Sequence, residues 1–269
     1  MESTFVLVQM ESVADPAENL KKAEYYCEQA AGKYHPDFIV FPETFMTEVI
    51  GGEIASRNAW SQTLDGPFVT GMRELAKRFG VWMAFGMKET VEDPEDHRVY
   101  NSVVMLNSDG EIVEVYHKTH LYDAFGYKES DEFKAGDAFF EPVDTPFGKV
   151  GLFVCYEVRF PEVARYQRSK GADIILMPTA WVKGDLKSLH FNTLITARAI
   201  ENTVYMLACD QYSKTRMGES VAVDPMGVTI SCAGEGEKII PVYIDSERIE
   251  EVRKKLPAYK DRRPALYTI

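Results

Sequence analysis

Residues 103–118, VVMLNSDGEIVEVYHK, decide the fold class of this chain. Two strand patterns flank the turn-forming residues NSDG at 107–110, which predicts a β-hairpin. A second segment, SVAVDPMGVTISCAG at residues 220–234, repeats this pattern around DPMG. Antiparallel hairpins are not expected in a Rossmann sheet or in a (β/α)₈ barrel, which needs eight parallel strands. The hairpins therefore favour an α/β fold with mixed sheets.

Short runs of β-branched and aromatic residues predict the remaining buried strands. These runs are Phe5–Gln9, Asp37–Phe41, Val81–Met87, Ser102–Leu106, Val150–Val154, Ile174–Met177, Val204–Ala208 and Ile239–Ile244. Between several of them, apolar residues recur at helical spacing over residues 20–31 and 68–79, and a third helix is expected over 187–202. Two sheets packed together, with helices outside, fit this mixture best.

Composition limits the possible partners of the chain. Its 269 residues, 45% of them hydrophobic, suit a single domain over residues 1–269. The formal net charge of −12 argues against a nucleic acid or an anionic membrane as partner. No apolar run approaches the roughly 18–20 residues of a membrane span, and the N-terminal segment lacks a basic region typical of signal peptides. We therefore expect a cytoplasmic protein.

The four cysteines are scattered and form no CxxC pair. Neither a disulfide scaffold nor a zinc site is expected from this spacing. Cys27, Cys209 and Cys232 are interpreted as packing residues. No HExxH, P-loop, GxGxxG or GxSxG pattern occurs, so the sequence indicates no metal, no nucleotide cofactor and no serine hydrolase.

Cys155 differs from the other cysteines because it follows the apolar run VGLFV and precedes the polar segment YEVRFPE. Pro161 marks a plausible helix start soon afterwards. A strand-to-helix turn would expose this thiol and direct backbone N–H groups at it. We expect these groups to lower the pKa of Cys155 and to form an oxyanion site.

Two further charged residues follow predicted strands. Glu43 comes after DFIVFP, where apolar surroundings should raise its pKa, and Lys118 ends EIVEVYHK. Each alone has an ordinary interpretation, as a capping or solvent-facing residue at the end of a strand. His117 and His120 flank Lys118, and either histidine could serve as the base. Strand alternation, however, places His117 on the face opposite Lys118, which argues against His117. Catalysis without histidine, metal or cofactor would need a carboxylate base and a cationic oxyanion partner.

Three segments resemble, in order and spacing, the Glu-Lys-Cys motifs of the nitrilase, or carbon-nitrogen hydrolase, superfamily. They are DFIVFPETF at residues 37–45, YHKTHLYD at 116–123 and GLFVCYEVRFPE at 151–162. The similarity extends through residues 127–137, 171–181, 196–202 and 219–227 and so covers nearly the whole chain. The resemblance implies a four-layer αββα sandwich that forms a homodimer or a higher homo-oligomer.

The resemblance also implies an amidase that releases ammonia and a carboxylic acid from a small carboxamide through a thioester. Cys155 would be the nucleophile and Glu43 the proton shuttle. Lys118 and the N–H of Tyr156 would hold the oxyanion. A second glutamate supports the lysine and positions the substrate in this family, and the matching residue is Glu129.

The identity of the substrate is less evident from the sequence. Tyr122 and Trp181 are candidates for the lining of an apolar pocket, although aromatic residues after strands are often core residues. Arg159 would suit an acidic substrate, but an arginine at this place more often pairs with a structural carboxylate such as Glu157 or Glu162. Glu157 also departs from the resemblance, because aspartate is frequent at that position.

Three alternatives remain open at the level of sequence. A nitrilase acting through a thioimidate, or an N-carbamoyl amine hydrolase, would use the same residues. A catalytically idle interaction domain is a third alternative, but such a domain has no need for a thiol and two buried carboxylates beside a lysine. The C-terminal tail, with Leu266 and Tyr267, could dock on a neighbouring subunit or on its own domain.

Overall fold

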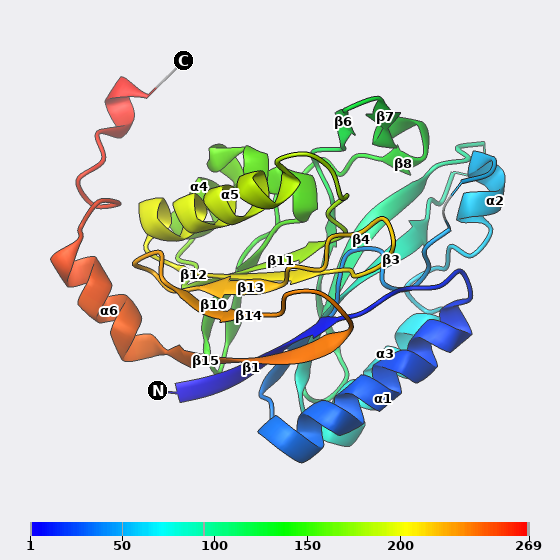
Figure 1. The fold of residues 1–269 in the computed structure, drawn as a ribbon, viewed down its shortest axis with the longest axis horizontal. Coiled ribbons are helices and arrows are strands. Elements are labelled where there is room, and N and C mark those ends of the chain that lie inside the picture. Colours follow the sequence, from blue (N-terminus) through cyan, green and yellow to red (C-terminus); the bar gives the residue numbers. More distant parts are fainter. Residues whose placement is uncertain (1, 50, 94, 268–269) are drawn as a thin grey trace.

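The computed structural model describes residues 2–49, 51–93 and 95–267. Two mixed sheets lie face to face, and helices cover the outer face of each, which confirms the predicted αββα sandwich (Figure 1). The helices are α1 (Pro16–Tyr34), α2 (Ile54–Asn58), α3 (Pro67–Phe79), α4 (Pro161–Ser169), α5 (Lys187–Asn202) and α6 (Ser246–Lys255). Helices α1 and α3 lie on one outer face and α4 and α5 on the other.

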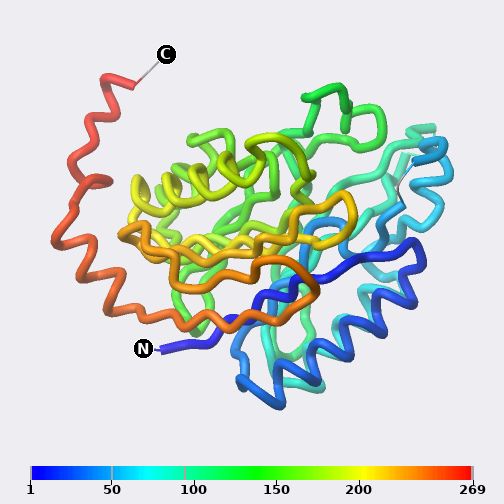
Figure 2. Tube along the Cα trace, viewed as in Figure 1, coloured from blue at the N-terminus to red at the C-terminus, as the bar shows by residue number. Residues whose placement is uncertain are grey.

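In the first sheet, segments from opposite ends of the chain are neighbours at one edge. Its strands, in order, are β15 (Lys238–Asp245), β1 (Glu2–Gln9), β2 (Phe38–Val40), β3 (Trp82–Thr90), β4 (Val99–Leu106) and β5 (Ile112–His117). The short strand β8 (Phe133–Lys134) also pairs with β4. Strands β1 and β15 are antiparallel over their whole length and lie side by side in Figure 2.

The second sheet carries the nucleophile candidate. Its strands, in order, are β14 (Thr229–Cys232), β13 (Val221–Val223), β12 (Tyr205–Asp210), β11 (Ile174–Thr179), β10 (Gly148–Leu152) and β9 (Val143–Thr145). Strands β10, β11 and β12 are parallel, whereas β13–β14 and β4–β5 are the two antiparallel hairpins that the sequence predicts. A separate two-stranded ribbon joins β6 (Asp123–Ala124) to β7 (Tyr127–Lys128).

Apolar side chains form three layers, one between the two sheets and one under the helices on each outer face. Alternation along the central strands explains these layers. In β1, Phe5 and Leu7 pack between the two sheets, whereas Val6 and Val8 pack toward α1 and α3. Side chains at successive strand positions point to opposite faces, so a strand that is covered on both sides is apolar throughout. The apolar core therefore leaves most polar groups of the strands near their ends.

The cysteine predictions are confirmed for Cys27 and Cys209, which are buried. The prediction is wrong for Cys232, which is exposed. Strand β14 is the last strand of its sheet, and the alternating pattern of an edge strand does not guarantee burial. None of the helices in the described ranges is long and apolar enough to cross a membrane.

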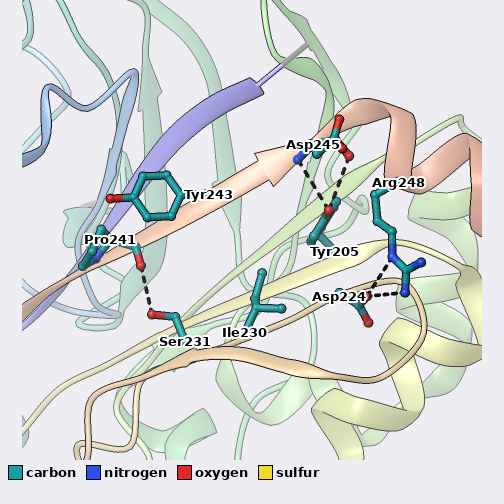
Figure 3. A pocket seen from close by; sticks show the side chains of 8 residues that line it. All are labelled: Tyr205, Asp224, Ile230, Ser231, Pro241, Tyr243, Asp245 and Arg248. Atoms are coloured by element: carbon teal, nitrogen blue, oxygen red, sulfur yellow. Dashed lines mark hydrogen bonds and ion pairs between the residues drawn. The ribbon is translucent and has the colours of Figure 1, made fainter.

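The chain beyond α6 runs past one end of the sandwich (Figures 1 and 2), and Arg168 of α4 lies 4.6 Å from the centroid of the Tyr259 ring in this tail. In this tail, Leu266 and Tyr267 are 63% and 52% exposed, as their sequence context indicates. A groove opens near the start of α6, and its lining includes Tyr243 and the ion pair between Asp224 and Arg248 (Figure 3). None of the residues that line this groove belongs to the polar cluster described below.

Candidate active site

The three residues singled out from the sequence meet at one edge of the sandwich. Glu43 follows β2, Lys118 follows β5, and Cys155 follows β10 in the other sheet. In parallel neighbours, the carboxyl ends of strands lie at the same edge, which is where α/β folds present polar groups. The packing of two sheets thus brings together side chains that are 112 residues apart in the chain from Glu43 to Cys155.

Lys118 joins two buried carboxylates. Its Nζ lies 2.8 Å from Oε1 of Glu43 and 3.0 Å from both carboxylate oxygens of Glu129. The three side chains are between 1% and 5% exposed. Asn101 on β4 donates its amide to Glu43 over 2.8 Å and to Glu129 over 3.1 Å. Charge-assisted bonds of this kind stabilise ions that would otherwise be costly to bury.

The other carboxylate oxygen of Glu43 is fixed from the second sheet. The backbone N–H of Ala180, just after β11, donates to Oε2 of Glu43 over 2.8 Å. The side chain of Gln211 donates to the Glu43 backbone carbonyl over 2.7 Å. Gly86 on β3 lies so close to this segment that an added Cβ would be 2.4 Å from the nitrogen of Thr44. Glu43 is therefore held in one position by both sheets.

Cys155 begins a 3₁₀ helix, Cys155–Arg159, that leads into α4 with Pro161 as its first residue. This confirms the predicted strand-to-helix turn. The φ angle of Cys155 is +48°, in the left-handed region that non-glycine residues rarely adopt. Such a conformation costs free energy, and it places the nucleophile candidate in a sharp turn, where the residue as a whole is half-buried.

The pKa of Glu43 differs from the expectation. Burial acts to raise it, as predicted, but the charge of Lys118 and hydrogen bonds from Lys118 and Asn101 outweigh burial. The pKa of Glu43 is therefore lowered. For Glu129, burial and the charge of Glu43 outweigh the attraction of Lys118, and its pKa is raised. One ammonium is thus shared by two carboxylates of unequal acidity, while the pKa of Lys118 itself lies well above its usual value.

The pKa of Cys155 is also opposite to the expectation. Burial and the neighbouring Glu43 carboxylate raise it well above its usual range, despite Lys118 and the backbone N–H of Ala180, which act to lower it. The turn does not produce a resting thiolate, because burial and the Glu43 carboxylate both disfavour the charged form of Cys155. The resting pair is a neutral thiol beside an ionised carboxylate, and a hydrogen bond from the thiol contributes to the low pKa of Glu43.

Glu157, two residues after Cys155, ties the turn of the nucleophile to the segment that follows Lys118. Its Oε1 accepts hydrogen bonds from the Tyr116 hydroxyl, from the backbone N–H and hydroxyl of Thr119, and from the backbone N–H of His120. Its Oε2 accepts the backbone N–H of Val154 over 2.7 Å. The side chain is fully buried, and these bonds lower its pKa against the effect of burial.

The three predicted substrate-binding residues lie around this cluster. The Tyr122 ring packs edge-on against Tyr156 with centroids 5.1 Å apart, and the Tyr122 backbone N–H donates to Glu129. Trp181 follows Ala180 directly, and its indole donates to the backbone carbonyl of Lys187 over 3.1 Å. All three aromatic residues are thus attached to elements that carry the polar cluster.

Arg159 does not form the expected ion pair with Glu157 or Glu162. Glu157 is occupied by the donors described above, and none of the ion pairs in the described residues includes Arg159. Its guanidinium instead lies over the Trp181 ring at 5.0 Å and over the Tyr156 ring at 5.8 Å.

The histidines stand apart from the nucleophile candidate. His117 contacts Glu89 at 2.9 Å and stacks on Tyr100, on the face of β5 away from Lys118. His120 stacks on Phe160 and contacts Glu157. Among the residues that the structure describes, no group of three histidine, cysteine or acidic side chains is arranged to hold a metal ion.

Sequence reasoning missed Asn101 and the bridging contacts of Glu157. A signal existed for Asn101, because an amide inside the otherwise apolar strand pattern VYNSVVML needs a buried hydrogen-bond partner. No comparable signal identified the partners of Glu157, since they come from a segment about 40 residues earlier in the chain.

Comparisons with known proteins agree with this geometry. The model of the family described as carbon-nitrogen hydrolase matches residues 6–254. The chain is 39% identical to deaminated glutathione amidase of Escherichia coli O157:H7 over 76% of each chain. It is 32% identical to omega-amidase NIT3 of Saccharomyces cerevisiae over 97% of this chain and 94% of that protein.

Solved structures show the same architecture. The crystal structure of Saccharomyces cerevisiae Nit3 superposes with a TM-score of 0.86 at 30% identity and covers 97% of both chains. A carbon-nitrogen hydrolase from Helicobacter pylori superposes with a TM-score of 0.89 at 25% identity, over 99% of this chain and 97% of the other. On the strength of these matches and of the fold, this chain belongs to the carbon-nitrogen hydrolase family of the nitrilase superfamily.

Proposed function

We propose that this carbon-nitrogen hydrolase cleaves a small carboxamide with Cys155 as nucleophile and Glu43 as general base. The observation that carries the proposal is the pairing of a neutral Cys155 thiol with an ionised Glu43 that Lys118, Asn101 and Ala180 hold in place. A carboxylate can act as a base only in its ionised form. A carboxylate that is already held in position needs no further ordering before it accepts the proton.

In the first half-reaction, Glu43 takes the Sγ proton while Sγ attacks the amide carbon. The carbonyl oxygen becomes an oxyanion, which the ammonium of Lys118 and the N–H of Tyr156 stabilise. Protonated Glu43 then transfers its proton to the leaving nitrogen, the C–N bond breaks, and ammonia departs. An acyl group remains on Cys155 as a thioester.

In the second half-reaction, Glu43 removes a proton from water as the water oxygen attacks the thioester carbon. The C–S bond breaks, the acid is released, and the proton returns from Glu43 to sulfur. Glu129 supports this cycle by accepting hydrogen bonds from Lys118 and by fixing the backbone N–H of Tyr122. No step calls for a metal or an organic cofactor.

The test is ammonia release from a panel of small amides, carbamoyl amines and nitriles, measured for the native chain and for Cys155→Ala. We expect amide hydrolysis that the substitution abolishes, with a carboxylic acid as the product in mass spectrometry. Turnover of the same amide by Cys155→Ala at the native rate would overturn the scheme. Carbonate released with the ammonia would indicate a carbamoyl substrate, and exclusive turnover of nitriles would indicate a nitrilase.

We propose that residues 1–269 act as one domain, located in the cytoplasm, that assembles at least as a homodimer. The pairing of β1 with β15 supports a single unit, since it joins the first and last strands. The projecting tail with exposed Leu266 and Tyr267 supports assembly, because such apolar side chains gain stability when a second copy covers them. Sedimentation equilibrium of the full chain and of a chain that ends at residue 255 tests this, with a shift toward monomer expected for the shorter chain.

A further inference from the structure

We propose that Glu132 is a positioning residue for the polar cluster of the active site. Its ion pairs with Lys88 and Arg57 fix the turn that carries Glu129. Through Glu129, this turn places the ammonium of Lys118. The inference rests on the proposed amidase function and adds to it a second group of buried charges that lies outside the reacting groups.

Glu132 is buried and shared by two cations. Its Oε1 lies 2.6 Å from Nζ of Lys88, and its Oε2 lies 2.7 Å from Nη1 of Arg57. Lys88 and Glu132 are each 3% exposed, and Lys88 also donates to the backbone carbonyl of Arg57 over 3.1 Å. The Tyr127 hydroxyl donates to Oε2 of Glu132 over 3.4 Å. Buried charges are costly unless their partners are well placed, so these side chains constrain one another closely.

One short turn joins Glu132 to Glu129. The 3₁₀ helix Glu129–Asp131 begins with one glutamate and is followed directly by the other. The Glu132 N–H donates to the Glu129 carbonyl over 3.0 Å, and the Glu132 carbonyl accepts the N–H of Val99 over 3.1 Å. A displacement of Glu132 is therefore passed on to Glu129, whose two carboxylate oxygens both bind Lys118.

Two neighbouring strands hold the two ends of this turn. Lys88 on β3 and Asn101 on β4 are directly opposite each other in the antiparallel register. Residues that are opposite in such a pair project from the same face of the sheet. Asn101 donates to Glu129 over 3.1 Å, and Lys88 donates to Glu132 over 2.6 Å. Adjacent side chains of the first sheet thus attach the turn at both ends.

The charges of the two groups are complementary. In the polar cluster, Glu43 and Glu129 share the single ammonium of Lys118, which leaves one negative charge in excess. Around Glu132, two cations share one carboxylate, which leaves one positive charge in excess. Opposite charges at the two ends of one short turn attract each other, so each group favours the ionised form of the other.

The same turn carries a second ion pair that provides the matched control. Oδ1 of Asp131 lies 2.7 Å from Nζ of Lys128, but these side chains are 52% and 64% exposed. Exposed pairs of this kind contribute little, because water screens the charges and the side chains lose entropy when they pair. Asp131→Asn makes the same chemical change as Glu132→Gln, in the same turn, without a buried partner.

The first experiment measures kcat and KM for the best amide of the panel. Glu132→Gln should lower kcat about 10- to 100-fold with little change in KM, because a misplaced Lys118 weakens an interaction made in the transition state. Asp131→Asn should change kcat less than about two-fold. In a chain that already carries Glu129→Gln, Glu132→Gln should have almost no further effect, since it acts through Glu129. An equal loss in both backgrounds would overturn the inference.

A double variant separates position from stability. Glu132→Gln leaves Lys88 buried without its carboxylate, which destabilises the fold. Lys88→Met combined with Glu132→Leu removes the buried pair and fills its space with apolar side chains, a change that often preserves stability. We expect a native-like melting temperature together with the loss of kcat seen in Glu132→Gln. A native kcat in this double variant would mean that the pair serves stability alone, and would overturn the inference.

The second experiment does not depend on turnover. The backbone N–H of Tyr122 donates to the Glu129 carboxylate, so its hydrogen exchange reports the position of Glu129. Mass spectrometry of peptides should show faster exchange around Tyr122 in Glu132→Gln and in Glu129→Gln, with no further increase when the two substitutions are combined. The N–H of Val154, which donates to Glu157 in the other sheet, is the reference.

The outcomes of this second experiment are separate from those of the amide panel. Unchanged exchange around Tyr122, or equal acceleration around Val154, would contradict a positioning role for Glu132 whether or not the chain hydrolyses amides. Faster exchange confined to Tyr122 would support that role. Absence of amide hydrolysis by the native chain would count against the proposed function alone.

Discussion

Two glutamates, Glu43 and Glu157, are similarly buried, but we assign a catalytic role to Glu43 and a structural role to Glu157. Both are less than 5% exposed, and the pKa of each is lowered although burial acts to raise it. Glu157 accepts hydrogen bonds mainly from hydroxyl groups and backbone N–H groups. Glu43 is held by a lysine, an asparagine and one N–H, and it contacts a thiol that carries a transferable proton.

The difference shows that burial and a shifted pKa do not by themselves identify a catalytic carboxylate. The partners do. Backbone and hydroxyl donors from both segments make Glu157 a structural link between the turn at Cys155 and the segment after Lys118. A neighbouring thiol that can lose a proton makes Glu43 a base. Each prediction below tests one part of this contrast.

The largest effect is expected for Glu43→Gln. The amide keeps the shape of the side chain but cannot accept a proton, so kcat/KM should fall about 10²- to 10⁴-fold. Ammonia release from the best amide of the panel measures this effect. The substitution should reduce the free energy of unfolding less than Glu157→Gln does, and native-like activity of Glu43→Gln would contradict its role as base.

For Glu157→Gln, we expect a larger loss of stability and a smaller loss of activity than for Glu43→Gln. Its amide N–H₂ would face donors that now bond a carboxylate oxygen, so the free energy of unfolding should fall by about 1–3 kcal/mol. Urea unfolding followed by circular dichroism measures it. Activity should fall because the turn at Cys155 loosens, and Glu157→Asp, which keeps the charge, should recover part of both losses. A full loss of activity with unchanged stability would instead place Glu157 in the chemistry.

Gly86→Ala tests whether the position of Glu43 matters as much as its charge. The new Cβ would lie 2.4 Å from the Thr44 nitrogen and 2.6 Å from the Pro42 carbonyl oxygen, so the segment must shift. A displacement of this kind should reduce kcat/KM about 10²-fold. Gly32→Ala in α1 is the control, because its Cβ meets nothing within 4 Å; it should leave activity unchanged and stabilise the helix by roughly 0.5–1 kcal/mol.

The smallest effect is expected for Asn101→Ala, and it appears in the pH profile. The hydrogen bond from Asn101 favours the ionised form of Glu43 and so lowers its pKa. Without this bond the pKa of Glu43 rises, and Glu43 becomes protonated at a higher pH. The acid limb of the kcat/KM profile should therefore shift to higher pH. The profile of the native chain over pH 3–9 is the reference. An acid limb that stays in place would mean that another group controls it.

Much of the fold was predictable because it follows from local patterns. The eight predicted runs all fall on strands, and both predicted hairpins form. Alternation placed His117 away from Lys118 correctly, since strand geometry fixes the faces of neighbouring residues. The exposure of Cys232 was not predicted, because it depends on the place of β14 as the last strand of its sheet, which only the tertiary structure decides.

The sequence by itself determined the elements, the motif residues and their order in the chain. Only the tertiary structure decided the electrostatics, since a pKa depends on charges that the two sheets bring together over long sequence separations. The sequence indicated a raised pKa for Glu43 and a lowered one for Cys155, and both directions reversed once Lys118 and Glu43 were in place. The same reason applies to Arg159, whose lack of a carboxylate partner is visible only when every neighbour is known.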